Sequence, residues 1–167
     1  MQGIQKKIGS DYMELSFGPQ WTYISCVRSF VTNFFAIGLN DKVQAEKISL
    51  AISELLENAV KYSSGSDAYV RAEISEEGSR VVVVVENIAK GEHIPILKEE
   101  IRKVCAGTPE EAYMSKLQEA ATRTDGKSQI GLARVRFETG AEITLEIDGN
   151  QVKVHAVFQL NGGSSDE

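Results

Sequence analysis

The sequence predicts an α+β fold, a two-layer sandwich in which helices cover one face of a mixed, mostly antiparallel sheet. Three observations support this expectation. Two hairpin patterns stand far apart in the chain, two long helical patterns precede the first hairpin, and a largely helical stretch separates the hairpins. Because a hairpin pairs antiparallel strands and each helix must bury an apolar stripe, we expect the helices to share one side of the sheet.

The first half of the chain is expected to hold one strand and two helices. A polar arm at 1–11 precedes a short strand at 12–17, where polar and apolar residues alternate before a Gly-Pro pair. An apolar helix follows at 20–37 and ends at a glycine. The next helix has Asp41 as its N-cap and continues to residue 62.

The second half is expected to alternate hairpins and helices. The elements are strands at 68–75 and 80–86, helical residues at 88–127 and 130–139, and strands at 142–147 and 151–160. A Gly-Thr-Pro break divides the longer helical stretch, and an Asp-Gly-Asn turn joins the last two strands. A run of valines in the second strand predicts burial on both of its faces. We therefore expect a single domain at 12–160 and a disordered tail at 161–167.

Composition narrows the classes of function. The 167 residues are enough to bury a core, and 42% hydrophobic with 25% charged residues is ordinary for a globular protein. A net charge of −6 argues against a nucleic-acid-binding protein, which needs a basic face. No stretch has the pattern of a signal peptide or a membrane span, so we expect a cytoplasmic protein. Cys26 and Cys105 lack metal-ligand spacing and are expected to be buried thiols.

The most informative residues lie in the second half of the helix expected at 41–62. Glu54, Asn58 and Lys61 are four and three residues apart, so they share one face of the helix, and that face borders the apolar stripe. A carboxylate, an amide and an ammonium group would then line the edge of the core, where a pocket can form. The alternative is a solvated face with an internal ion pair.

The segment Glu54-x-x-x-Asn58-Ala-x-Lys61-Tyr62 resembles the N-box of the GHKL superfamily of histidine kinase-like ATPases, and the expected order of elements matches that fold. The resemblance implies a site for ATP and Mg²⁺. In such a site Asn58 would ligate Mg²⁺, which favours hard oxygen ligands, and Glu54 would be the general base. Lys61 would meet phosphate charge, and Tyr62 would pack near the adenine or the ribose.

The next box of the family, Asp-x-Gly-x-Gly, is altered in this chain. Either Glu86 or Asn87 would have to replace the aspartate that accepts a hydrogen bond from the adenine amino group. Ile88 and Lys90 occupy the first two glycine positions, unless Gly91 slides into register. The β-branched side chain of Ile88 would be pushed toward the adenine.

The last box, Gly-x-Gly-Leu-Gly-Leu, opens a helix whose backbone amides hold phosphates in the family. Gly131, Leu132 and Val135 match this pattern, whereas Lys127 and Gln129 replace the first two glycines. The loop that closes over ATP is therefore expected to be compromised, although a lysine near a helix start still suits phosphate.

Together these features predict a bacterial cytoplasmic signalling regulator that acts by protein–protein interaction and in which nucleotide binding is weak or lost. The intact N-box favours an alternative, an active MgATP-dependent protein serine kinase of the anti-sigma factor type in a partner-switching system. The resemblance implies a protein partner in either case: an antagonist protein, a sigma factor or another effector.

The helix expected at 20–37 is unusually aromatic, with Trp21, Tyr23, Phe30, Phe34 and Phe35. Most of these side chains are expected in the core. Tyr23, Phe30 and Phe34 nevertheless share one face, and the other two lie off it. A helix with aromatic residues on two sides would cover two surfaces, and the second one suits a homodimer or another protein partner.

Overall fold

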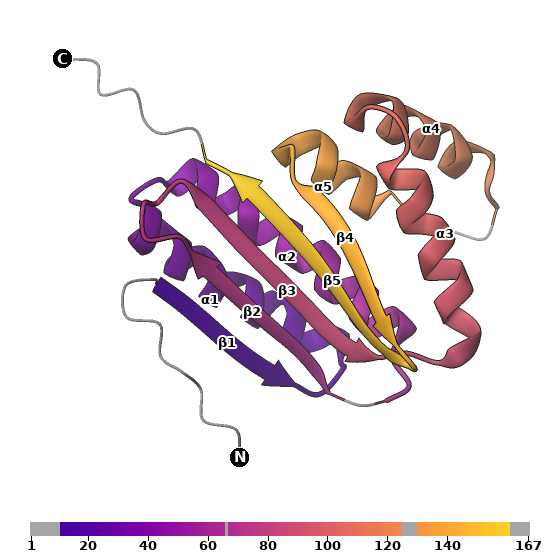
Figure 1. Ribbon diagram of the computed structural model, residues 1–167, viewed down its shortest axis with the longest axis horizontal. Coiled ribbons are helices and arrows are strands. Elements are labelled where there is room, and N and C mark those ends of the chain that lie inside the picture. The colour runs from indigo at the N-terminus through magenta and orange to yellow at the C-terminus, as the bar shows by residue number, and fades with distance from the viewer. Residues whose placement is uncertain (1–10, 66, 125–129, 161–167) are drawn as a thin grey trace.

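The computed structural model describes residues 11–65, 67–124 and 130–160, and it confirms the expected α+β sandwich (Figure 1). The strands are β1 (Asp11–Phe17), β2 (Ala68–Ile74), β3 (Arg80–Ile88), β4 (Glu142–Asp148) and β5 (Gln151–Gln159). The helices are α1 (Trp21–Leu39), α2 (Lys42–Tyr62), α3 (Ile94–Cys105), α4 (Pro109–Thr122) and α5 (Gly131–Thr139), with a 3₁₀ turn, η1, at Gly91–His93. The tail at 161–167, and all of the predicted arm except Asp11, lie outside the described residues.

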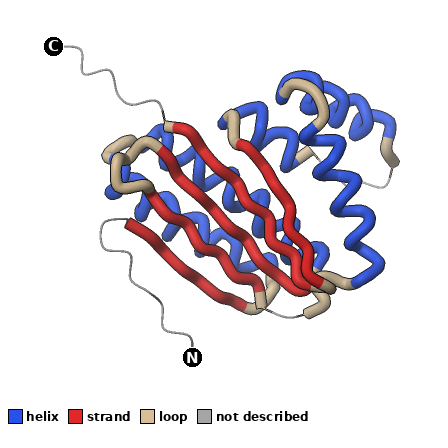
Figure 2. The backbone as a smooth tube through the Cα atoms, in the orientation of Figure 1, coloured by secondary structure: helices blue, strands red, loops and turns tan. Residues whose placement is uncertain are grey.

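The five strands form one sheet in the order β1-β2-β3-β5-β4, and every neighbouring pair is antiparallel. The mixed sheet of the prediction is therefore fully antiparallel in the described residues. Strands β3 and β4 run in the same direction, but β5 lies between them and pairs antiparallel with both. Helices α1 and α2 lie against one face of the sheet, and α3 and α4 extend beyond its β4 edge (Figures 1 and 2).

The valine run in β3 shows how this layering sorts side chains. Val81, Val83 and Val85 are buried against the helices, whereas Val82 and Val84 are half-buried on the opposite face. Burial on both faces was therefore a wrong expectation, because only one face of the sheet carries helices and successive strand residues point to opposite faces.

The face of the sheet without helices is polar and paired. Arg71 forms ion pairs with Glu14 and Glu73, and the Lys153 Nζ lies 3.4 Å from the Glu86 carboxylate. Such a face suits contact with water. None of the helices in the described part of the chain is both long and apolar enough to span a membrane.

The caps of α2 and α4 are formed by the residues that the sequence predicts, Asp41 and Thr108. The Asp41 side chain accepts hydrogen bonds from Val43 N at 3.0 Å and Gln44 N at 3.1 Å, and so begins α2. At α4, Thr108 and Glu111 form a reciprocal capping box. These local contacts fix where α2 begins and where the helical region after β3 divides.

Helix α1 differs from expectation. Its buried stripe is Ile24, Val27, Val31 and Phe35, so Phe35 is the one aromatic residue of this helix in the core. Burial of most of its aromatic side chains was a wrong expectation, because the sheet and α2 cover a single narrow face of the helix.

The two thiols also differ from expectation. Cys26 and Cys105 are both exposed residues, not buried ones. Cys26 lies on the outer side of α1, one residue before the buried Val27. The Cys105 Sγ is partly covered, because it donates to the Ile143 carbonyl at 3.4 Å, and burial raises the pKa of this thiol.

Candidate functional site

A cavity of about 90 Å³ opens beside the C-terminal half of α2, where the start of α1 and the helices α3 and α5 also meet. It gathers most of the predicted site, because its lining includes Glu54, Asn58, Lys61, Tyr62, Gly131 and Leu132. Trp21 lines it from α1, and Leu97 and Glu100 line it from α3. The helical spacing of the α2 residues thus places them along one wall, as expected.

A second, smaller cavity of about 10 Å³ shares Asn58, Tyr62 and Leu132 with the first and extends to the sheet at Asn87. Asn87 is only 6% exposed, and its Nδ2 has no hydrogen-bond partner. A buried amide donor without an acceptor is unfavourable unless something is bound there. Of the two candidates Glu86 and Asn87, it is therefore Asn87 that faces this site.

Three predicted residues, at the end of β3 and just after it, lie elsewhere. Glu86 points to the opposite face of the sheet, where it accepts from Gln151 and pairs with Lys153. Ile88 is paired with Gln151 in the sheet and is 37% exposed, so it does not enter the site as expected. Gly91 starts η1 near Asn150 and lines neither cavity. The two-residue period of a strand explains why Asn87 points inward and its neighbours do not.

The residue predicted as a general base, Glu54, is already engaged. Its Oε1 lies 2.6 Å from the Arg134 Nη2, an ion pair between α2 and α5. Its Oε2 packs directly against Gly131, so closely that a Cβ at this position would collide with it. The Glu54 carboxylate thus packs beside the first turn of α5, whose N-cap residue Ile130 has no side-chain capping hydrogen bond.

Arg134 was missed by sequence reasoning. The available signal was its position one helical turn after Gly131, which places both residues on one face of α5. Lys127 and Gln129, the other substitutions in this box, lie outside the described residues.

The charge of Glu54 is destabilised by its surroundings. Burial raises the pKa of this carboxyl, and Arg134 opposes the shift without cancelling it. Smaller contributions come from Glu57 and Glu138, which raise the pKa, and from Arg28, which lowers it. The folded state therefore binds a proton at Glu54 more tightly than the unfolded chain does.

Replacing Glu54 with glutamine is expected to show this effect as a pH dependence. A raised pKa contributes stability below the unfolded pKa and loses it as pH rises through the folded pKa. The free energy of unfolding of wild type, relative to Glu54→Gln, should therefore fall between pH 4 and pH 7. Urea denaturation at both pH values measures it, with Glu57→Gln as control; a relative stability that rises with pH would contradict the assignment.

Lys61 and Tyr62 make the polar end of the cavity. The Lys61 Nζ lies 5.0 Å from the centre of the Tyr62 ring, and the same ring meets His93 edge-on at 5.6 Å. The chain after β3 is held against this end of α2, because Lys90 N donates to the Tyr62 carbonyl at 3.1 Å.

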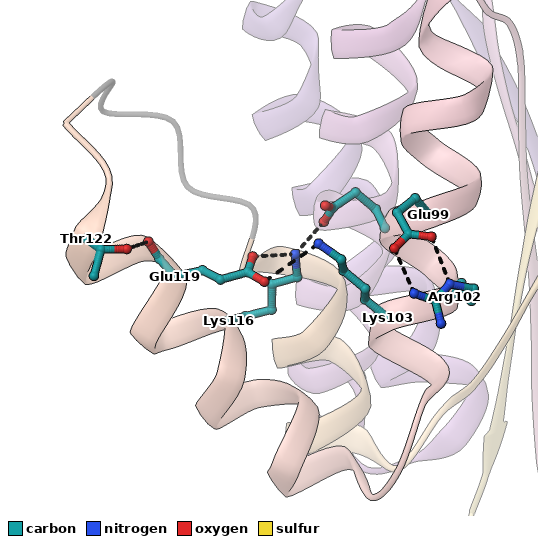
Figure 3. Close-up of polar contacts among 7 residues, drawn as sticks. Glu99, Arg102, Lys103, Lys116, Glu119 and Thr122 are labelled. Carbon is teal, nitrogen blue, oxygen red and sulfur yellow. Dashed lines mark hydrogen bonds and ion pairs between the residues drawn. The ribbon is translucent and has the colours of Figure 1, made fainter.

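The far wall of the cavity is fixed by a buried ion network between α3 and α4 (Figure 3). The Lys116 side chain is 3% exposed, and its Nζ donates to Glu100 at 2.8 Å and Glu119 at 2.9 Å. Burial acts to lower the pKa of Lys116, but these carboxylates raise it above its ordinary value. Glu100 both lines the cavity and belongs to this network.

Among the described residues, the cavity is small for a nucleotide. Ligand sites of drug-sized molecules occupy roughly 300–1,000 Å³, well above the volume found here. Its lining carries three carboxylates, on Glu54, Glu57 and Glu100, against the ammonium of Lys61. Asn58 offers an oxygen that suits Mg²⁺. Two of the three carboxylates are already paired, Glu54 with Arg134 and Glu100 with Lys116.

No model of a known protein family matches this chain, and no curated protein matches it. Solved structures do share its fold. One is a chain in the crystal structure of the SiaB-SiaC complex from Pseudomonas aeruginosa, with a TM-score of 0.62 and 15% sequence identity. The similarity covers 86% of this chain and 88% of that chain, and at this identity it shows a common fold.

Proposed function

We propose that this protein is a signalling regulator that acts by binding another protein, and that its nucleotide site is weak or lost. One observation carries the proposal: the Glu54 carboxylate is paired with Arg134 and lies against Gly131 at the start of α5. In the family that the N-box resembles, this helix start holds phosphate. A carboxylate that lies beside this helix start repels a phosphate there, and it occupies Arg134, a cation that could otherwise meet phosphate charge.

Two further observations support the loss of nucleotide. The cavity is small, about 90 Å³. Glu54 also cannot act as a free general base while Arg134 holds it, because a base must reach the proton it accepts.

A role in protein binding is supported by the fold and the surface. The similar chain comes from a structure of two proteins in complex. In this chain, Tyr23 and Phe30 share one face of α1 and are each about half exposed, and large exposed apolar side chains that gather together mark interaction sites. We place the protein in the bacterial cytoplasm, with an antagonist protein, a sigma factor or another effector as partner.

The alternative function is a MgATP-dependent protein serine kinase of a partner-switching system. The observations that favour it are the convergence of Asn58, Lys61 and Tyr62 on one cavity and the unpartnered amide of Asn87 beside it. This function would require Glu54 to leave Arg134 and the cavity to widen.

The blocking role of Glu54 can be tested by removing its side chain. Glu54→Ala should strengthen MgATP binding about tenfold or more, a gain of roughly 1.4 kcal/mol, because it frees Arg134 and opens the start of α5. Trp21, the sole tryptophan of the chain, lines the cavity, so its fluorescence reports the titration.

Glu57→Ala is the matched control, because Glu57 lines the same cavity but does not contact Gly131. It removes the same charge and should change the affinity less than about threefold. Equal effects of the two substitutions would show that general charge, and not the placement of Glu54, limits nucleotide binding.

A further inference from the structure

The smaller of the two cavities, called here the inner cavity, has a polar end and aliphatic walls. It adjoins the larger cavity, because Asn58, Tyr62 and Leu132 line both. Asn87 lines it from the sheet. The rest of its lining is aliphatic: Leu55, Ala59, Val85, Leu97, Val152 and Val154. Apolar walls with a few placed polar groups are typical of a site for a small organic molecule.

Asn87 interrupts an apolar row on β3. The inward-facing residues before it, Val81, Val83 and Val85, are each at most 2% exposed. Asn87 continues this row at 6% exposed, and its Nδ2 has no hydrogen-bond partner among the described residues. Valine at this position would extend the row without burying an unpaired donor, so asparagine makes the ligand-free fold less stable than it could be. A residue that lowers stability in this way is typical of a binding site.

The amide of Asn87 determines the chemistry of a matching ligand. It offers a donor, Nδ2, beside an acceptor, Oδ1. A primary carboxamide or a cyclic amide carries the same two groups on one edge, so it can accept from Nδ2 and donate to Oδ1 at once. A charged group is disfavoured, because the aliphatic walls offer it no counter-charge. The ligand is therefore neutral.

Size restricts the ligand further. The inner cavity, about 10 Å³, has room for one polar group, since a single water molecule needs about 10–15 Å³. The larger cavity, about 90 Å³, is smaller than the cavity of about 150 Å³ that holds benzene in a protein core. The apolar body of the ligand is thus limited to a few carbon atoms beside Leu97 and Leu132, which line both cavities.

We propose that Asn87 binds a small neutral molecule through a carboxamide or cyclic amide, with the amide in the inner cavity and the apolar body in the larger one. Glu54 lines only the larger cavity, so this binding does not require its ion pair with Arg134 to break. The inference goes beyond the proposed function, because it assigns the protein a small-molecule ligand in addition to a protein partner.

Titration with isobutyramide, followed by NMR of the Asn87 side-chain amide, tests the site. The signal, assigned by its loss in Asn87→Val, should shift saturably with a Kd of about 1–10 mM, as suits a ligand of six heavy atoms. Methyl isopropyl ketone has a methyl group in place of the amide nitrogen and should bind at least about fivefold more weakly. Isobutyrate, which is ionised at neutral pH, should bind at least about tenfold more weakly.

Three results of these titrations would overturn the proposal. Equal affinities for the ketone and the amide would show that the paired donor and acceptor of Asn87 are not used. The absence of a saturable shift with isobutyramide up to about 50 mM would show that the inner cavity takes no amide. Adenosine that shifts the same signal at micromolar concentration would assign the cavity to a nucleotide base.

The stability of the ligand-free protein gives an independent test. Asn87→Val should raise Tm by at least about 2 °C more than Ser16→Val does, because it removes an unpaired buried donor. Ser16 is exposed on β1, so its variant controls for the higher strand propensity of valine. Asn87→Val should also abolish isobutyramide binding, measured by calorimetry. An equal or smaller rise, or a lower Tm, would show that the fold itself satisfies the amide and would overturn the proposal.

Discussion

Phe35→Ala is expected to lower the free energy of unfolding by about 3–5 kcal/mol. Phe35 is 0% exposed and is among the largest fully buried side chains of the core. Its ring also meets Phe34 edge-on at 5.2 Å. Removing it leaves a cavity between α1 and the rest of the core that the surrounding side chains fill only in part. Urea denaturation followed by circular dichroism measures the change.

Phe30→Ala is the matched control, five residues earlier on the same helix. Its side chain is half exposed, so in dilute, monomeric protein the same substitution should change the free energy of unfolding by less than about 1 kcal/mol. Similar losses for the two variants would contradict the assignment of Phe35 to the buried stripe of α1 and of Phe30 to its exposed surface.

Lys116→Met is expected to lower the free energy of unfolding by about 3 kcal/mol, the lower end of the range for breaking a buried ion pair. The lower end applies because Glu119 is 39% exposed and can be hydrated after the change. Glu100, at 13%, cannot be hydrated as well and would be left as a buried charge without its partner. The same denaturation experiment measures the effect.

The double variant Lys116→Met with Glu100→Gln separates the lost ion pair from lost packing. It should recover at least half of the stability, because no uncompensated charge then remains at Glu100. A double variant as unstable as Lys116→Met would show that packing of the lysine side chain, and not the stranded carboxylate, accounts for the loss.

The fold was predictable because local signals agreed with one another. The Asp41 cap, the Thr108 capping box and the turn at Asp148-Gly149-Asn150 each determine the end of an element from neighbouring residues. The antiparallel pairing of β3 with β5 was harder to predict from the sequence, because it joins strands on either side of a long helical insert.

The site was predictable along α2 and at the start of α5, where Gly131 and Leu132 line the cavity. Helical spacing placed Glu54, Asn58 and Lys61 on one wall of the cavity, because that spacing is set within a single element. The contact of Glu54 with Arg134 was not predictable, because it joins residues 80 positions apart. For Glu86 and Asn87, the strand period required them to face opposite sides, but the sequence did not show which of them faced the helices.

Calorimetric titration of the wild-type protein with ATP, with and without Mg²⁺, shows directly whether MgATP binds weakly or not at all while Glu54 is paired with Arg134. We expect no saturable heat at micromolar nucleotide in either case. A Mg²⁺-dependent Kd in the micromolar range or below, about −8 kcal/mol or stronger, would contradict it and favour the kinase.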